Sequence, residues 1–315
     1  MRIYVCLLVF ILTHVSLYPQ IYVGTTYEAK GHENVYFPLG EISFADSIVS
    51  FDKGIPRPLV RYQDPLKALG PPDYTGYNSQ TFVSLGCGGS LVVKFNGNGF
   101  MNLKGDDLYI YEVGPSRESA LVEISVDGEN WIEAGVIDGG KAALDLSDRG
   151  IDNETVFYYV RVTDLKDLCR GPSAGADIDA IGAINSVVKI AIYADVLFDV
   201  GKYAIKPEAE KILDSLILNI NQFSKVDLVI EGHTDSDGGE EMNQVLSENR
   251  SLSVKNYLKS KLKRPEDYQY KVAGFGKLKP KVPNTSPENK QQNRRVEIII
   301  LPPDTYNNNN TLDKD

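Results

Sequence analysis

The stretch VDLVIEGHTDSDG, residues 226–238, decides the fold of the C-terminal half of the chain. Its first five residues are mostly apolar and predict a buried strand over residues 226–230. Residues 240–262 then carry apolar side chains at helical spacing, which predicts an amphipathic helix. The members of this expected apolar stripe are Met242, Leu246, Val254, Tyr257 and Leu258.

The strand and the helix bring an acid and an arginine close together. Arg250 lies four residues from both Leu246 and Val254, so it falls on or beside the apolar stripe. An unpaired buried guanidinium is costly, and Asp235, just after the strand, is its expected partner. Such a pair can hold a small zwitterion, because the acid takes an ammonium and the arginine a carboxylate. The alternative is a structural ion pair that binds nothing.

Several motifs around this pair occur in a fixed order. They are VLFDVGKYAIKPEAEKIL at 196–213, EGHTD at 231–235, VAGFGKLKP at 272–280 and NRRVEI at 293–298. Over residues 188–302 the chain resembles the OmpA-like peptidoglycan-binding domain. The resemblance implies that Asp235 and Arg250 bind meso-diaminopimelate of the peptidoglycan stem peptide, with Thr234 and Asn243 lining the pocket. The family often has alanine where this chain has Ser251.

Two other polar features of these motifs are expected to serve packing. His233 is interpreted as a packing residue, because no second catalytic group lies at a useful spacing. Arg294 and Arg295 are expected to close the last strand with a salt bridge or to form a charge at the edge of the cleft, with a direct ligand role as the alternative.

Strands and helices alternate after residue 187. Pro207 is expected at the start of a helix whose buried stripe ends at Ile220, and a last strand is expected over residues 295–301. We therefore predict an α/β sandwich of order βαβαββ over residues 187–302. The polar tail, residues 303–315, is expected to be disordered.

The preceding residues, 21–186, predict an all-β domain. Short apolar strands alternate with Gly, Asp and Pro turns, and Asp127-Gly128 signals a hairpin. We predict a jelly-roll sandwich. The segments DPLKALGPPD (64–73), VEISVDGENW (122–131) and YVRVTDL (159–165) resemble the galactose-binding-like jelly-roll domains. That resemblance implies a glycan or protein partner, and some such domains hold a structural calcium ion.

Candidate ligand residues in this domain are acids and aromatics. Calcium binds carboxylate and carbonyl oxygens gathered from loops, and the candidates are Asp64, Asp73, Asp177 and Asp179. The alternative is that these acids form turns. A sugar-binding platform could draw on Tyr62, Tyr74, Tyr77 and Trp131, although such aromatics more often serve packing. Glu112 falls on the same strand face as Leu108 and Ile110.

The N-terminus resembles an export signal. Arg2 precedes a short apolar run over residues 3–13, which predicts a signal peptide over residues 1–20, with an uncleaved signal anchor as the alternative. Cys6 lies inside the apolar run, so lipid attachment is not expected. An exported chain favours a disulfide between Cys87 and Cys169 over two free thiols. The expected location is the periplasm, associated with the outer membrane.

The net charge of the chain limits the classes of partner that it can bind. The formal net charge of −10 argues against nucleic acid as a partner. The sequence therefore predicts a non-enzymatic envelope protein that binds peptidoglycan and, through its jelly roll, a glycan or another envelope component. No cofactor is expected beyond the calcium. The alternative is a carbohydrate-active enzyme, for which Glu112, Glu118 and Glu123 are the candidate acids.

Overall fold

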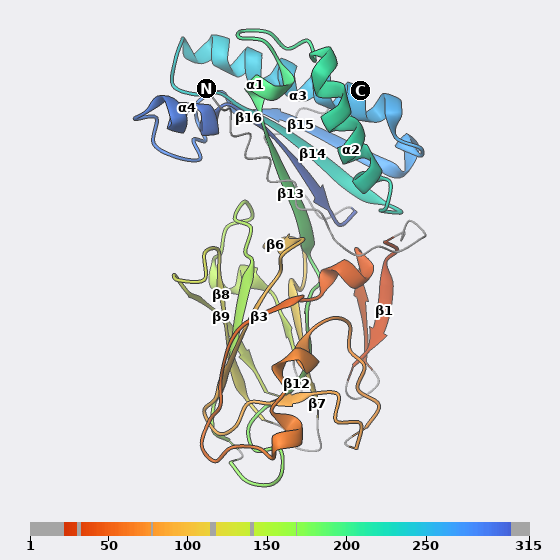
Figure 1. Ribbon diagram of the computed structural model, residues 1–315, viewed down its shortest axis with the longest axis vertical. Helices are drawn as coiled ribbons and strands as arrows, with labels where there is room; N and C mark the ends of the chain where they lie inside the picture. Colours follow the sequence, from red (N-terminus) through yellow and green to blue (C-terminus); the bar gives the residue numbers. More distant parts are fainter. Residues whose placement is uncertain are drawn as a thin grey trace.

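The computed structural model describes residues 22–29, 33–76, 78–113, 118–138, 142–167 and 169–303. The predicted signal peptide and residues 304–315 of the predicted tail lie outside these ranges. The described chain forms a β-rich unit and an α/β unit, joined end to end along the long axis of the molecule (Figure 1). Within the described ranges, no helix has both the length and the apolar character needed to cross a membrane.

The N-terminal unit is built from two β-sheets. The five-stranded sheet has the order β3 (Ser47–Asp52), β5 (Ser90–Lys94), β11 (Tyr159–Asp164), β8 (Ala120–Ser125), β9 (Ile132–Ile137). The four-stranded sheet has the order β10 (Ala143–Leu144), β7 (Leu108–Val113), β12 (Asp177–Ala183), β4 (Val83–Ser84). A small sheet of β1 (Thr25–Glu28) and β2 (Asn34–Phe37) lies beside them. The prediction that this part is all-β is confirmed; short 3-10 turns interrupt its loops.

The two larger sheets enclose one apolar core. Val93 of β5, Val160 of β11, Ile110 of β7 and Ile181 of β12 all belong to it and are fully buried. Strand β11 alternates partly exposed and buried residues, as expected when one face of a sheet packs on a core. Burying each such aliphatic side chain contributes about 1.5–3 kcal/mol, so this core is the main stabilising element of the unit.

The predicted hairpin at Asp127-Gly128 joins β8 to β9. The side chain of Asp127 accepts hydrogen bonds from the backbone N–H groups of Glu129 and Asn130, each at 2.8 Å, and these bonds hold its pKa well below the usual range. Gly128 has a φ of +82°, a left-handed conformation that glycine adopts without strain. The Asp-Gly pair therefore sets the turn.

The predicted disulfide is confirmed: Cys87 and Cys169 are bonded, and their positions are 82 apart in the sequence. It ties the loop after β4 to the segment between β11 and β12.

One continuous strand joins the two units. Strand β13 (Ser186–Tyr193) pairs through Ser186 and Val187 with β6 (Gly99–Phe100) of the N-terminal unit. From Val188 onward it pairs with β16 (Arg295–Leu301) of the C-terminal unit. The predicted boundary between residues 186 and 187 thus falls inside a strand, and no flexible linker separates the units there.

The C-terminal unit is a mixed sheet covered by helices on one face (Figure 1). Its order is β15 (Tyr268–Gly274), β14 (Val226–His233), β16, β13, with β14 and β15 parallel. Helices α2 (Glu210–Ile220) and α3 (Glu240–Lys261) pack on the sheet through a core that includes Leu213, Ile230 and Val254. The α/β prediction is confirmed. Two short helices absent from the predicted order, α1 (Ala194–Leu197) and α4 (Pro287–Asn293), flank the sheet.

The predicted apolar stripe of α3 is wrong in its first half. Met242 is 74% exposed, whereas Ser247 and Ser251 are fully buried. The reason is a close approach of helix to sheet: a Cβ on Gly232 of β14 would collide with the carbonyl oxygen of Ser247, and one on Gly274 of β15 with the backbone of Glu248. Only small helix residues fit where the backbones come this near.

Replacing Gly232 with alanine should therefore lower the free energy of unfolding by about 1–3 kcal/mol, because helix and sheet must separate to admit a methyl group. Urea unfolding measures the loss. The matched control is Gly239→Ala, since a Cβ at Gly239 meets nothing within 4 Å. An equal, small effect of both substitutions would contradict the close packing.

Removing the disulfide with Cys87→Ser and Cys169→Ser should destabilise the protein by up to about 4.5 kcal/mol. In the chain-entropy model that is the stabilisation expected for closing a loop of this length. Urea unfolding of the double variant, with and without a reducing agent, measures the effect. The reductant should shift the wild type towards the variant and leave the variant unchanged; an unshifted wild type would contradict a stabilising bond.

Candidate functional site

Asp235 lies at the end of β14, where the strand leaves the sheet. Thr234 anchors the turn, because its N–H donates to the carbonyl of Gly276 (2.8 Å) and its hydroxyl donates to the carbonyl of Asp235 (3.0 Å). The Oδ1 of Asp235 accepts from the backbone N–H of Asp237 at 3.0 Å. Asp235 is 7% exposed. Its carboxylate is therefore held in one orientation at the rim of the sheet.

Arg250 approaches the same place from α3. It is 4% exposed, and its guanidinium lies over the ring of Phe198, 5.3 Å from the centroid. Its Nε donates to the carbonyl of Lys202 (3.0 Å) and its Nη2 to that of Asp199 (3.5 Å). Burial lowers the pKa of Arg250, while Asp195 and Asp235 oppose that shift. The backbone carbonyl groups of the loop that follows α1 therefore hold this guanidinium in place.

The expected ion pair between Asp235 and Arg250 is not present. No salt bridge within 4.0 Å joins these two described residues. Instead, Nη1 of Arg294 donates to Oδ2 of Asp235 at 2.7 Å. Arg294 also forms a forked pair with Asp195 of α1, Nε to Oδ1 at 3.1 Å and Nη2 to Oδ2 at 2.8 Å. The hydrogen bond to Asp195 is the main reason that the pKa of Arg294 is raised.

Arg294 and Arg295 both form salt bridges, as predicted. Arg294 pairs with two acids at the candidate site, and Arg295 pairs with Glu297 at 2.7 Å on the sheet. Sequence reasoning noticed Arg294 in the motif NRRVEI without placing it beside Asp235. It did not single out Asp195, whose position depends on the short helix α1.

Asn243 stabilises the loop that carries Asp235. It is buried in the first turn of α3, and its Nδ2 donates to the carbonyl of Asp237 at 2.9 Å. Lys290 of α4 holds the carboxylate of Asp237 from outside at 2.6 Å, and Asn284 accepts from the N–H of Ser236. The four predicted site residues, Thr234, Asp235, Asn243 and Arg250, thus meet at one end of β14 and the facing side of α3.

The site contains two acids and two guanidinium groups, of which Asp235 and Arg250 are buried while Asp195 and Arg294 are partly exposed. Arg250 uses Nε and Nη2 in its hydrogen bonds to described residues, so Nη1 remains for a ligand carboxylate. The carboxylate of Asp235, oriented by Arg294, has lone pairs left for an ammonium. The arrangement can therefore recognise a group that carries both charges. Hydrogen bonds to charged groups contribute about 1.5–3 kcal/mol each.

The four aspartates predicted as calcium ligands have separate surroundings. Asp64 caps a 3-10 turn by accepting from the N–H of Leu66, and Asp177 accepts from the hydroxyl of Ser84. Asp179 accepts from the N–H of Tyr74 at 3.3 Å; burial, reinforced by neighbouring Asp73, raises its pKa to about 7. Asp73 lies close enough to Asp179 to affect its charge. The calcium site expected from the four aspartates stays a prediction.

The three described aromatic residues of the predicted sugar platform do not share one surface. Tyr62 stacks on Phe82 inside a small buried cluster, with the ring of Tyr74 edge-on to Phe82. Trp131 lies elsewhere, at the start of β9 under the guanidinium of Arg161. Tyr77 lies outside the described residues. The side chains of Tyr62, Tyr74 and Trp131 therefore make packing contacts in two separate places.

The three candidate acids of the N-terminal unit lie on or beside its strands. Glu123 of β8 forms a bidentate pair with Arg161 of β11, at 2.6 and 2.5 Å. Glu112 is buried on β7 opposite Ile178, and Glu118 is buried before β8. Glu123 is therefore bound within the sheet by a cross-strand ion pair.

Comparison with known proteins assigns the C-terminal part. Residues 197–294 match the OmpA family. Outer membrane protein A of Bordetella avium is 39% identical over 113 residues, covering 36% of this chain and 57% of that protein. Outer membrane porin F of Pseudomonas aeruginosa is 33% identical over 141 residues, covering 44% of this chain and 39% of that protein.

A solved structure shares the same region at lower identity. The peptidoglycan-associated lipoprotein of Burkholderia pseudomallei is 22% identical, covers 35% of this chain and 88% of that one, and has a TM-score of 0.30. The chain spans little more than half the length of the first curated relative above and less than half of the second. The family match and its motifs coincide with the strands and helices that build the site, and residues 197–294 of this chain are an OmpA family domain.

Proposed function

We propose that this protein is a non-enzymatic envelope protein that binds peptidoglycan noncovalently through its C-terminal domain. The observation that carries the proposal is that Asp235 and Arg250 are both buried at the end of β14 that bears the candidate site. This end of the strand belongs to a domain that matches the OmpA family. The ligand is the meso-diaminopimelate residue of the stem peptide. The free end of this residue carries one carboxylate and one ammonium, the two charges that the site can pair.

In this mechanism each charge of the ligand meets one fixed group. Arg250 donates from Nη1 to the carboxylate, while its other nitrogens stay bonded to the loop after α1. Asp235 accepts the ammonium. Thr234 and Asn243 act as positioning residues, because their hydrogen bonds hold the turn that carries Asp235.

Arg294 has a role that sequence reasoning did not assign. Its pairing with Asp195 and Asp235 keeps the carboxylate of Asp235 aimed at the site and balances the charge while no ligand is bound. The ammonium of the ligand then shares Asp235 with Arg294. Since the guanidinium is partly exposed, it can adjust to admit the ligand.

The N-terminal unit supplies the second contact of this function. We infer that its two sheets form a jelly roll that engages a glycan or another envelope component, while the C-terminal domain holds the wall. The protein would then be exported to the periplasm and associate with the outer membrane. Strand β13 would connect the two contacts, because it belongs to sheets in both units.

Asp235→Ala and Arg250→Ala test the proposal in a pull-down with purified peptidoglycan sacculi. Each substitution removes at least one charge-assisted hydrogen bond, so binding should weaken about tenfold or more. Arg250→Lys should also bind weakly, because an ammonium keeps the charge and loses the planar fork.

Glu241→Ala, on the exposed side of α3, is the matched control and should bind like the wild type. Circular dichroism checks that each variant is folded. Full retention of sacculi by both alanine variants would show that Asp235 and Arg250 are structural and that the wall is not their ligand.

The enzymatic alternative predicts release of reducing sugar from wall or capsule polysaccharide. It requires two acids across a cleft. Of its candidates, Glu123 is held by Arg161, and no observation favours the alternative over the binding function.

A further inference from the structure

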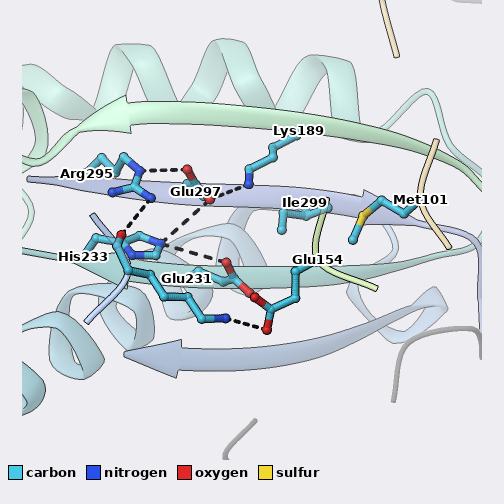
Figure 2. Close-up of a pocket in the computed structure, with 9 residues that line it drawn as sticks. Met101, Glu154, Lys189, Glu231, His233, Arg295, Glu297 and Ile299 are labelled. Atoms are coloured by element: carbon cyan, nitrogen blue, oxygen red, sulfur yellow. Dashed lines mark hydrogen bonds and ion pairs between the residues drawn. The ribbon is translucent and has the colours of Figure 1, made fainter. Parts of the chain in front are cut away.

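A pocket of about 90 Å³ lies between the two units, on the face of the C-terminal sheet opposite α2 and α3 (Figure 2). Met101 and Glu154 line it from the N-terminal unit. The sheet contributes the remaining side chains, which are Lys189, Glu231, His233, Arg295, Glu297 and Ile299, together with Lys279 from the loop after β15. The pocket is separate from the Asp235 site and plays no part in the function proposed above.

Three potential metal ligands converge in this pocket. The Nε2 of His233 lies 3.9 Å from Oε2 of Glu231 and 3.8 Å from Oε2 of Glu297. One ligand atom from each residue lies within 4.8 Å of the other two, and all three residues are buried. Figure 2 shows the imidazole between the two carboxylates, with its Nε2 directed at both.

These separations are too long for hydrogen bonds, which require about 2.7–3.2 Å for a nitrogen donor and an oxygen acceptor. They are close to the spacing of two ligands on one cation. Two atoms that each lie about 2.1 Å from a Zn²⁺ ion are about 3.4–3.6 Å apart in tetrahedral or trigonal geometry. A shift of a few tenths of an ångström would bring Nε2 of His233 and either carboxylate oxygen to the spacing of two ligands on one ion, and the two carboxylates must close from a separation of at most 4.8 Å.

His233 is the observation that points to a ligand. It is 2% exposed, and neither ring nitrogen has a hydrogen-bond partner among the described residues. A buried polar group without a partner is costly. Stacking on Phe275 (5.5 Å between centroids) fixes the ring plane. A neutral imidazole nitrogen that makes no hydrogen bond can offer its lone pair to a metal ion.

Two neighbouring cations orient the carboxylate of Glu297. Arg295 donates from Nε to Oε1 of Glu297 at 2.7 Å, which leaves Oε2 facing His233. Such support of a ligating carboxylate is usual around metal sites. Lys189 contacts that same Oε2 at 2.7 Å and therefore competes with a cation for it. The lysine side chain is 26% exposed on a flexible stem and can withdraw towards solvent.

We propose that Glu231, His233 and Glu297 form a binding site for a divalent transition-metal cation of the Zn²⁺ type. One imidazole nitrogen with two carboxylates suits Zn²⁺, Co²⁺ or Ni²⁺, whereas Ca²⁺ and Mg²⁺ take oxygen ligands. The pocket has room for a water molecule as the fourth ligand. A bound ion links β14 to β16 beside the ion pair of Glu154 and Lys279, which joins the two units at 2.7 Å.

Calorimetric titration of the metal-free, full chain with Zn²⁺ tests the site. The wild type should bind one ion, and Co²⁺ should give a visible absorption band. His233→Gln and Glu231→Gln should each weaken binding at least tenfold. Lys189→Gln should bind as tightly as the wild type or tighter, because the competing ammonium is removed. Zn²⁺ should raise the thermal unfolding midpoint of the wild type and leave that of His233→Gln unchanged.

The control variants are His32→Gln, which removes another histidine, and Glu241→Gln, which removes an exposed carboxylate. Both should bind like the wild type. Circular dichroism establishes folding, and the nearly isosteric Glu231→Gln keeps the test decisive if His233→Gln fails to fold. Two results would overturn the proposal: no Zn²⁺ binding by either the wild type or Lys189→Gln, or binding that persists unchanged in both Glu231→Gln and His233→Gln.

Discussion

The close approach of α3 to β14 and β15 is the constraint on which the rest of the C-terminal domain depends. Gly232 and Gly274 let the helix backbone rest directly on the strands, where a Cβ would collide. At the same contact, the hydroxyl of Ser247 accepts from the N–H of Gly276 at 2.9 Å and donates to the carbonyl of Gln244 at 2.9 Å. Because the helix packs this closely on the sheet, the position of Arg250 relative to the end of β14 is fixed. Asp235 follows the last residue of that strand.

Charge balance is the second constraint. In both the Asp235 site and the His233 pocket, cationic side chains pair with the buried carboxylates. At the end of β14, Arg294 ties Asp195 to Asp235, and the carbonyl groups of the loop after α1 hold Arg250. On the opposite face of the sheet, Lys189 and Arg295 hold Glu297 beneath His233. Both centres use β14 and the beginning of β16, so the same two strands carry the proposed wall contact and the proposed cation site.

Local pattern predicted the elements better than the contacts between them. Three features could be predicted from the sequence, because apolar runs, turn residues and cysteine use are local signals. They are the strand at residues 226–230, the turn at Asp127-Gly128 and the disulfide between Cys87 and Cys169. The pairing of Asp235 with Arg294 could not be predicted in this way, because the two residues are 59 positions apart in the sequence. Hydrophobic periodicity also misplaced Met242, since a helix seated on glycines buries serines instead. Nothing in the linear pattern indicated that His233 meets Glu297 across the sheet.

The central claim is that the site recognises the paired charges at the free end of diaminopimelate. Calorimetric titration of the full chain with two stem peptides tests it most directly. The peptides are identical except that one carries meso-diaminopimelate and the other lysine, whose free end lacks the carboxylate. Our account predicts saturable binding of one diaminopimelate peptide per chain, with at least about tenfold weaker binding of the lysine peptide because Arg250 loses its partner. Equal affinity for the two peptides, or no binding of either, would contradict it.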